Sequence, residues 1–229
     1  CFVTRRASTS GARLSPFGLK TDYCSTSWCA KAMRHSEPSS ERNKYASHSW
    51  GCVEDVRVLQ LLPLIADVRS SGEVLLLFHE VVVGLGADAG VFLSCLRDDA
   101  TQTSFRSMWA CDPSWAAAYA AHRWFEHDPW LRYASSNAEP IRSSDLACSS
   151  NQEIDFTNAA AQHGFTPTLI APAPSPVGLS RVGVLCLGSV DPSHLDGESY
   201  PKVRVLARAL AMELHHWIAR SMREELLQG

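Results

Sequence analysis

The sequence predicts an α+β domain, a layered α/β/α sandwich with a central antiparallel sheet. Two pairs of consecutive strand-like segments each have a short polar or proline-rich turn between them, which is typical of hairpins. Helical patterns separate the two pairs, and a long amphipathic pattern follows the second pair. Strands grouped in hairpins, with helices between and after them, form an antiparallel sheet covered by helices.

The first elements are two helices. From Glu54 the apolar positions repeat at helical spacing, which predicts an amphipathic helix that ends at 70–72 (Ser-Ser-Gly). A second helix is expected over 73–85, and its apolar residues are so dense that more than one of its sides should be buried. A hairpin follows, with strands over 90–97 and 103–110.

Capping residues define the helices in the middle of the chain. Pro113 opens a helix with Asp112 as its N-cap, and a short second helix begins at Pro129 after Asp128. A third helix is predicted over 152–163 and should end at Gly164, because glycine is favoured just past a helix C-terminus.

The chain then returns to the sheet and ends in a long helix. Strands are expected over 166–173 and 181–189, and a helix over about 200–227. One stripe of that helix carries Leu210, Leu214 and Trp217, which is typical of a face that covers a sheet, although a role in a dimer interface is the alternative. The neighbouring histidines at 215–216 are interpreted as a solvated helix edge.

The chain divides at about residue 50. Residues 1–49 are rich in Ser, Thr and Arg and lack periodicity, so we expect a disordered or non-native N-terminal extension. Residues 50–229 are expected to form one domain, with no helix-turn-helix domain present. Residues 51–229 carry 13 Lys/Arg and 21 Asp/Glu, so no direct nucleic-acid contact is expected from this acidic body.

The cysteines and the apolar runs indicate the compartment. The eight cysteines are scattered without metal-ligand spacing, which favours a reducing compartment and predicts neither a metal site nor a cofactor. The apolar run over 74–86 is too short to span a membrane, so no membrane association is expected. A cytoplasmic location is therefore predicted.

The densest group of unusual residues lies over 111–130. Trp115 and Tyr119 are four residues apart and so share one helix face, and each combines an aromatic body with a hydrogen-bond donor. Such groups can hold the carbonyls of a partly apolar ligand, although packing in the core is the commoner use of such a pair. Asp128 can cap the next helix, or it can accept a hydrogen bond from a ligand amide.

This set resembles the signature of the autoinducer-binding domain of LuxR-type quorum-sensing regulators. Trp115, Tyr119, Asp128 and Pro129 carry the resemblance, and the predicted elements follow the family's order over about residues 53–227. The resemblance implies that the ligand is an N-acyl-homoserine lactone. Trp115 would donate to its lactone carbonyl and Tyr119 to its acyl carbonyl, while Asp128 would accept from its amide N–H.

Three positions depart from the family's pattern. Ser143 stands where the family usually has a tryptophan, Thr168 where it often has a glycine, and Cys186 where it has a Ser or Thr that contacts the ligand. Two outcomes are open at the position of the missing tryptophan: a roomier pocket, or a space filled by Trp130 or Trp109. The predicted ligand is therefore an N-acyl-homoserine lactone or an analogue, with Ser143, Cys186 and Trp130 added to the candidate ligand-binding residues.

The predicted function is that of a sensor domain, which couples a quorum-sensing signal to dimerisation and transcription regulation. Its expected partners are the small-molecule autoinducer and either a second copy or a full-length homologue. Three alternatives remain. The first is a decoy, deficient in DNA binding, that dimerises with full-length regulators. The second is a GAF- or PAS-like sensor of another small molecule. The third is an enzyme that uses His122, His127, Asp128 or Cys186, but the sequence lacks a nucleophile motif, so the chain is predicted not to be an enzyme.

Overall fold

A computed structural model describes residues 2–8, 50–97, 102–175, 181–191, 193–195 and 197–228. Six strands form one sheet in the order β1-β3-β2-β6-β5-β4, and each strand is antiparallel to its neighbours. The strands are β1 (Phe2–Ser8), β2 (Ala89–Arg97), β3 (Gln102–Ala110), β4 (Ile141–Arg142), β5 (Thr168–Pro174) and β6 (Arg181–Gly188). The helices are α2 (Trp50–Leu61), α3 (Leu64–Asp67), α4 (Ser71–Gly84), α5 (Pro113–Ala121), α6 (Pro129–Ala134), α7 (Asn151–Ala161) and α8 (Tyr200–Gln228), with short 3-10 turns at Trp124–Glu126 and Ser143–Asp145.

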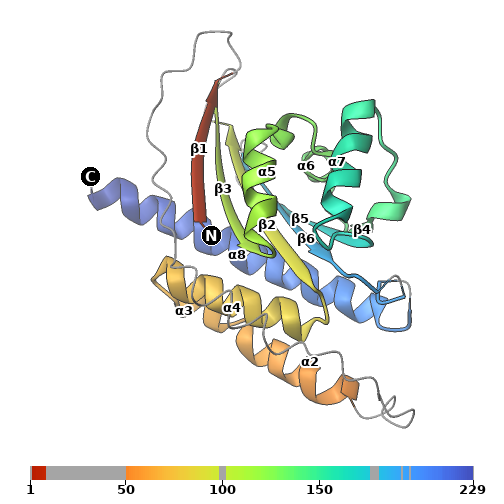
Figure 1. Cartoon of the computed structure of the whole chain (residues 1–229). Helices are drawn as coiled ribbons and strands as arrows, with labels where there is room; N and C mark the ends of the chain where they lie inside the picture. Colours follow the sequence, from red (N-terminus) through yellow and green to blue (C-terminus); the bar gives the residue numbers. More distant parts are fainter. Residues whose placement is uncertain are drawn as a thin grey trace.

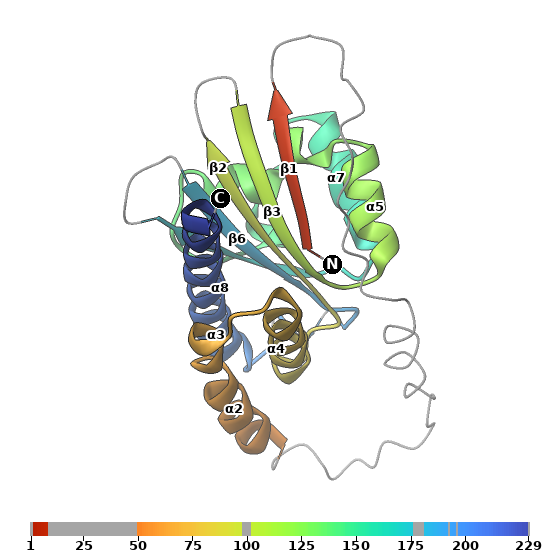
Figure 2. The same cartoon turned by 90° about the vertical axis from the view of Figure 1, so that its left-hand side faces the viewer.

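Helices cover both faces of the sheet, which confirms the predicted sandwich. In Figure 1, α5, α6 and α7 lie on one side of the strands, and α8 with α3 and α4 lies on the other. Figure 2 shows the same separation from the side, with α2, α3, α4 and α8 grouped together. The central hairpin β2–β3 and the hairpin β5–β6 are both present, as the sequence predicts.

Side chains that point alternately to the two faces of the sheet divide the core into two halves. In β6, Leu185 and Leu187 belong to the apolar cluster under α4 and α8, whereas Val184 and Cys186 belong to the cluster under α5, α6 and α7. Successive residues of a strand point to opposite faces, so one strand supplies both halves. The second cluster contains Trp115 and the other aromatic residues around it.

The caps predicted at Asp112 and Asp128 are present, Ser70 and Ser150 are further caps that were not predicted, and one predicted helix is corrected. Ser70, Asp112, Asp128 and Ser150 each accept a hydrogen bond from a backbone N–H in the first turn of α4, α5, α6 and α7 respectively. The predicted first helix is in fact two helices, because α2 ends at Leu61 and α3 begins at Leu64. Pro63 lies at the break, where it cannot donate the N–H that a continuous helix requires.

The expectation for the N-terminal stretch is corrected at residues 2–8. These residues form β1, which pairs with β3 in register from Phe2 opposite Met108 to Ser8 opposite Gln102. Without β1, β3 would be an edge strand with unpaired backbone groups, and such an edge accepts a further strand readily. Residues 9–49 lie outside the described part of the chain.

The long helix α8 covers the sheet. Leu210, Leu214 and Trp217 are buried in the first apolar cluster, so within this chain they pack against the sheet rather than form a free dimer surface. The interpretation of His215 as solvated is wrong, because its side chain is buried. A Cβ added at Gly183 would lie 2.7 Å from His215 Nδ1, so the imidazole packs where β6 has no side chain.

Gly188 permits a close approach between β6 and the turn after α7. A Cβ at this position would lie 2.2 Å from the carbonyl oxygen of Gly164 and 2.7 Å from Phe165 Cα. Both are backbone atoms, so no rotation of a side chain relieves the clash. We expect Gly188→Ala to lower the free energy of unfolding by about 3 kcal/mol, at the upper end of overpacking costs.

Chemical denaturation with a matched control checks this prediction. Gly72→Ala is the control, because a Cβ at Gly72 meets nothing within 4 Å. Alanine in a helix is favoured over glycine by about 0.5–1 kcal/mol, so this variant should be at least as stable as the wild type. Equal stability of Gly188→Ala and the wild type would contradict the backbone approach.

Candidate ligand-binding site

Trp115, Tyr119 and Asp128 meet inside the second half of the core. The side chains of Trp115 and Tyr119 leave α5 one turn apart, with ring centroids 5.9 Å apart in an edge-to-face arrangement. The Tyr119 hydroxyl donates to Asp128 Oδ2 at 2.8 Å. All three residues are buried, at 1%, 8% and 4% exposure respectively. The structure therefore brings together the three residues on which the sequence prediction rests.

Asp128 caps α6 and also faces the site. Its Oδ1 accepts the backbone N–H groups of Trp130 at 2.8 Å and Leu131 at 3.1 Å, while Oδ2 accepts the Tyr119 hydroxyl. An ionised carboxylate has about four acceptor positions. These contacts occupy three positions, which leaves one on Oδ2 for a further donor. The two interpretations of Asp128, cap and acceptor, are thus compatible.

Burial controls the ionisation of this group. Removal from water raises the pKa of Asp128 to about 6, although the hydrogen bonds from Tyr119, Leu131 and Trp130 oppose the rise. Burial, together with the Asp128 charge, raises the pKa of Tyr119 well above its usual value. Tyr119 therefore stays protonated and acts as a hydrogen-bond donor, while Asp128 titrates just below neutral pH.

Phe156 of α7 lies at the centre of an aromatic cluster, which we define as Phe156, Phe165, Trp109, Trp115, Tyr119, Trp124 and Trp130. The ring centroid of Phe156 lies 4.8 Å from Trp130, 5.8 Å from Trp115, 5.8 Å from Trp124 and 6.1 Å from Tyr119. Edge-to-face and tilted pairs at these distances are favourable beyond the area that they bury. The sequence analysis did not single out Phe156, although its place on the buried face of α7 is a signal that could have found it.

Cys186 and Trp130 also lie in this half of the core, whereas Ser143 does not. Cys186 is fully buried on β6, and burial followed by the Asp128 charge raises its pKa well above the usual value, so it remains a neutral thiol. Trp130 is 4% exposed and packs on Phe156. Ser143 is half-buried and accepts the backbone N–H of Thr168 at 3.1 Å.

The contact between Ser143 and Thr168 joins two of the three positions that depart from the family's pattern. The Thr168 hydroxyl in turn donates to the Phe165 carbonyl at 2.8 Å. These hydrogen bonds hold the start of β5 against the turn at Ser143–Asp145 and the residue after Gly164. Ser143 and Thr168 therefore hold the backbone segments next to the site in place. Of the three positions, only Cys186 lies among the side chains that surround the site.

A partly buried ion pair fixes the two helices that hold Trp130 and Phe156. Arg132 of α6 donates through Nε to Glu153 Oε1 at 2.6 Å and through a terminal nitrogen to Oε2 at 3.0 Å. Ser149 donates to Oε2 as well, through its backbone N–H at 2.6 Å and its hydroxyl at 2.9 Å. Burial alone would raise the pKa of Glu153, but these hydrogen bonds outweigh it and the pKa is lowered.

The profile of the autoinducer-binding domain matches residues 70–216, which is more than half of the chain. The chain belongs to the autoinducer-binding domain family of LuxR-type regulators. No curated protein sequence shows a significant match to it.

Solved structures of LuxR-type proteins share the fold of this autoinducer-binding domain. One is the N-acylhomoserine lactone-dependent LuxR family transcription factor CepR2 from Burkholderia cenocepacia, with 13% identity, a TM-score of 0.59, and coverage of 73% of this chain and 96% of that chain. Escherichia coli SdiA matches with 15% identity, a TM-score of 0.54, and coverage of 71% and 66%. SdiA in complex with octanoyl-rac-glycerol matches with 16% identity, a TM-score of 0.52, and coverage of 70% and 66%. This chain thus spans slightly less than two thirds of the SdiA chain.

The family is one of signal-binding regulator domains and not an enzyme family. Within the described ranges, no group of three or more His, Cys, Asp or Glu residues is placed to hold a metal ion. Of the histidines considered for an enzyme, His122 contacts the carbonyl of Ala118 through Nδ1 at 3.0 Å and stacks on Trp124. None of the helices in the described part of the chain is long and apolar enough to cross a membrane.

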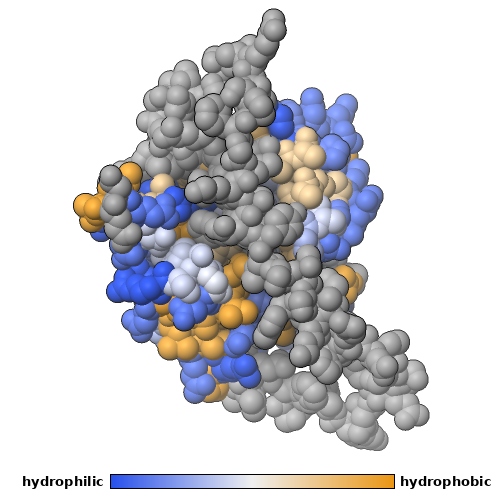
Figure 3. All heavy atoms as spheres, turned by 60° about the vertical axis from the view of Figure 1, so that its left-hand side comes forward, coloured by the Kyte–Doolittle hydropathy of each residue, from blue (hydrophilic) through white to orange (hydrophobic). Residues whose placement is uncertain are grey.

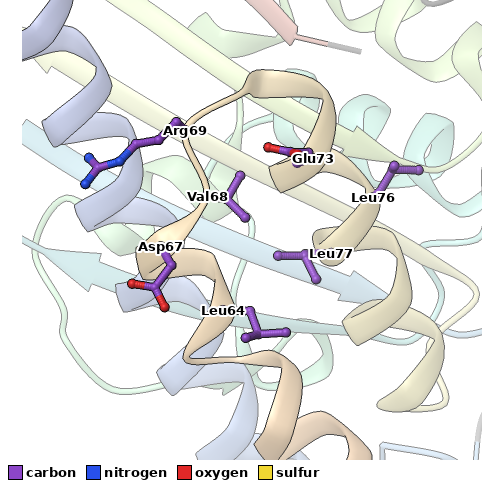
Figure 4. Close-up of a pocket in the computed structure, with 7 residues that line it drawn as sticks. All are labelled: Leu64, Asp67, Val68, Arg69, Glu73, Leu76 and Leu77. Atoms are coloured by element: carbon purple, nitrogen blue, oxygen red, sulfur yellow. The ribbon is translucent and has the colours of Figure 1, made fainter.

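A groove on the other side of the autoinducer-binding domain is separate from this site. It lies between α3 and α4, and Figure 4 shows the seven residues that line it, Leu64, Asp67, Val68, Arg69, Glu73, Leu76 and Leu77. Leu64 and Leu76 are about half exposed, and apolar side chains gather among charged ones in the lower part of Figure 3. None of the lining residues belongs to the aromatic cluster, so the groove and the candidate site are on opposite faces of the sheet.

Proposed function

We propose that this chain is the ligand-binding sensor domain of a LuxR-type transcription regulator and binds an N-acyl-homoserine lactone or a close analogue. The observation that carries the proposal is the hydrogen bond from Tyr119 to the buried Asp128 carboxylate. A buried carboxylate with an unused acceptor position suits an amide N–H, because a charge-assisted hydrogen bond contributes about 1.5–3 kcal/mol. The aromatic cluster around it provides apolar contact for an acyl chain.

Each head-group contact has a residue of suitable chemistry. We propose that Trp115 donates its indole N–H to the lactone carbonyl and that Tyr119 donates to the acyl carbonyl. The single hydroxyl hydrogen of Tyr119 points to Asp128 in this structure, so it must turn from Asp128 to the ligand on binding. The ligand N–H then bonds to Oδ2. The carboxylate thus accepts three hydrogen bonds both before and after binding.

Ligand-dependent thermal stability tests the proposal. The panel is a series of N-acyl-homoserine lactones of increasing chain length, with octanoyl-rac-glycerol added because SdiA has been solved in complex with it. At a ligand concentration of about 100 times Kd, the gain in unfolding free energy is about 2.7 kcal/mol, which raises Tm by about 5–10 °C in a domain of this size. If no member of the panel raises Tm at tens of micromolar, the proposed ligand class is wrong.

We further propose that ligand binding is coupled to dimerisation, either with a second copy or with a full-length homologue. Because stable protein interfaces bury apolar surface, half-exposed side chains such as Leu64 and Leu76 show that unused apolar surface is present. Sedimentation velocity with and without the stabilising lactone tests the coupling. We expect a shift from monomer to dimer when ligand is added, and an unchanged monomer would contradict it.

A further inference from the structure

The indole N–H of Trp130 is a buried donor that lacks an acceptor among the described residues. Trp130 is 4% exposed, and its Nε1 has no hydrogen-bond partner. The Nε1 of Trp124 is likewise buried without a partner among the described residues, whereas Trp109 Nε1 donates to the Ser107 hydroxyl at 2.7 Å and Trp217 Nε1 donates to the Val68 carbonyl at 2.9 Å. More than nine in ten buried polar groups are paired, so an unpaired donor in a binding domain calls for an acceptor from outside the chain.

This donor lies within the candidate site. The Trp130 ring is 4.8 Å from Phe156 and 5.6 Å from Phe165, and Trp115 packs against the same two phenylalanines at 5.8 Å and 6.3 Å. The backbone N–H of Trp130 is bound to Asp128 Oδ1. Trp130 therefore belongs to the same group of side chains as the proposed acceptor of the ligand amide.

A water molecule is a less suitable acceptor at this position. A buried water makes about three hydrogen bonds to polar groups. The rings against which Trp130 packs most closely are phenylalanines, which offer no strong acceptor or donor. A carbonyl or hydroxyl oxygen on a largely apolar ligand needs only one donor and can enter such surroundings.

We propose that Trp130 is a specificity-determining residue whose indole N–H donates to an oxygen on the acyl chain next to the ligand amide. The ligand would then be a 3-oxo- or 3-hydroxyacyl-homoserine lactone rather than one with an unsubstituted chain. The position follows from the anchor, because Asp128 takes the amide N–H and the third chain carbon, which carries the oxygen, lies two bonds beyond the acyl carbonyl carbon. This inference rests on the proposed function and specifies its ligand.

Calorimetric titration with a matched pair of ligands tests the proposal. The ligands are N-(3-oxooctanoyl)- and N-octanoyl-homoserine lactone, which differ only in the chain oxygen. We expect the wild type to bind the 3-oxo ligand about tenfold more tightly, since the unsubstituted chain leaves the buried donor unpaired. Trp130→Phe removes the N–H and keeps an aromatic ring, so the two affinities should become equal within about threefold.

Trp217→Phe is the control, because Trp217 lies in the other half of the core and its N–H is already bound to the Val68 carbonyl. It should keep the preference for the 3-oxo ligand. A wild-type-like preference in Trp130→Phe, or no preference in the wild type, would overturn the inference and leave the proposed function intact. A wild type that binds neither ligand nor any other member of the lactone panel would contradict the proposed function itself.

A measurement on the wild type covers the case in which Trp130→Phe does not fold. In protein with ¹⁵N-labelled tryptophan, the indole proton of Trp130 should move downfield when the 3-oxo ligand is added, as a new hydrogen bond forms. The N-octanoyl ligand should not produce this shift. Equal shifts with both ligands would refute the assignment of Trp130 to the chain oxygen.

Discussion

Phe156→Ala is expected to lower the free energy of unfolding by about 4 kcal/mol, which is within the usual range for a buried phenylalanine. Phe156 is 0% exposed and packs against Trp115, Tyr119, Trp124 and Trp130. Four large rings fixed by two helices and a 3-10 turn cannot close over the space that the phenyl group leaves. The cost therefore includes the cavity as well as the lost transfer free energy.

Ile154 on the same helix provides the control. Its side chain is 46% exposed, so Ile154→Ala should change the stability by no more than about 1 kcal/mol. Urea denaturation of both variants and the wild type gives the comparison. If Phe156→Ala were as stable as Ile154→Ala, the aromatic cluster would have to be loosely packed, and the geometry of the site would need revision.

The same cluster provides both stability and the candidate site. Because Trp115 and Tyr119 pack on Phe156, a ligand that replaces some of these contacts must supply contacts of its own. A bound acyl chain would then become part of the core of the domain. We therefore expect ligand binding to raise the free energy of unfolding strongly, since the ligand binds the native state only.

Local patterns were sufficient to predict most of the fold. Asp112 and Asp128 precede prolines that can begin a helix, so the caps of α5 and α6 could be placed from a few residues. The strands over 90–97 and 103–110, with turn residues between them, were predicted as a hairpin, and they pair from Gly90 opposite Ala110 to Arg97 opposite Thr103. These features depend on neighbours in the sequence and not on distant contacts.

Features that depend on distant residues could not be predicted in this way. The contact between Ser143 and Thr168 joins residues 25 positions apart, and nothing near either residue indicates the other. The pairing of β1 with β3 joins residues about a hundred positions apart, and the burial of His215 on α8 depends on the glycine at 183 in β6. In each case the deciding partner is brought close only by the completed sheet.

Asp128→Asn is expected to weaken lactone binding by about 10- to 100-fold at pH 7, which corresponds to the loss of one charge-assisted hydrogen bond. The amide keeps one oxygen for the N–H groups of Trp130 and Leu131. Its NH₂ group replaces the acceptor Oδ2 that faces Tyr119 and the ligand. Titration calorimetry of both proteins with the same lactone measures the difference.

The pH dependence of binding distinguishes a charge effect from a change of shape. Because the pKa of Asp128 in the free protein is about 6, the wild type should lose affinity as the pH falls through 6, by about tenfold between pH 7 and about pH 5. The ligand N–H favours the ionised carboxylate, which gives the sign. Asp128→Asn should bind with the same low affinity across this range. A wild type with constant affinity would show that Asp128 does not bind the ligand as a carboxylate.

The free energy of unfolding of the protein without lactone provides an independent check on Asp128, because its dependence on pH has the opposite sign to that of the affinity. The pKa of Asp128 rises from 3.8 to about 6 on folding, so its contribution to stability is greatest below about pH 4 and is lost as the pH rises through 6. Burial lowers the pKa of His215 from 6.5 to about 4, and this destabilises the fold on acidification in both proteins. The difference between wild type and Asp128→Asn removes the histidine effect. From pH 4 to pH 7, the free energy of unfolding of Asp128→Asn should therefore rise relative to that of the wild type. Over the same range the affinity of the wild type for the lactone should increase. The two trends are opposite because the ligand N–H offsets the cost of burying the Asp128 charge.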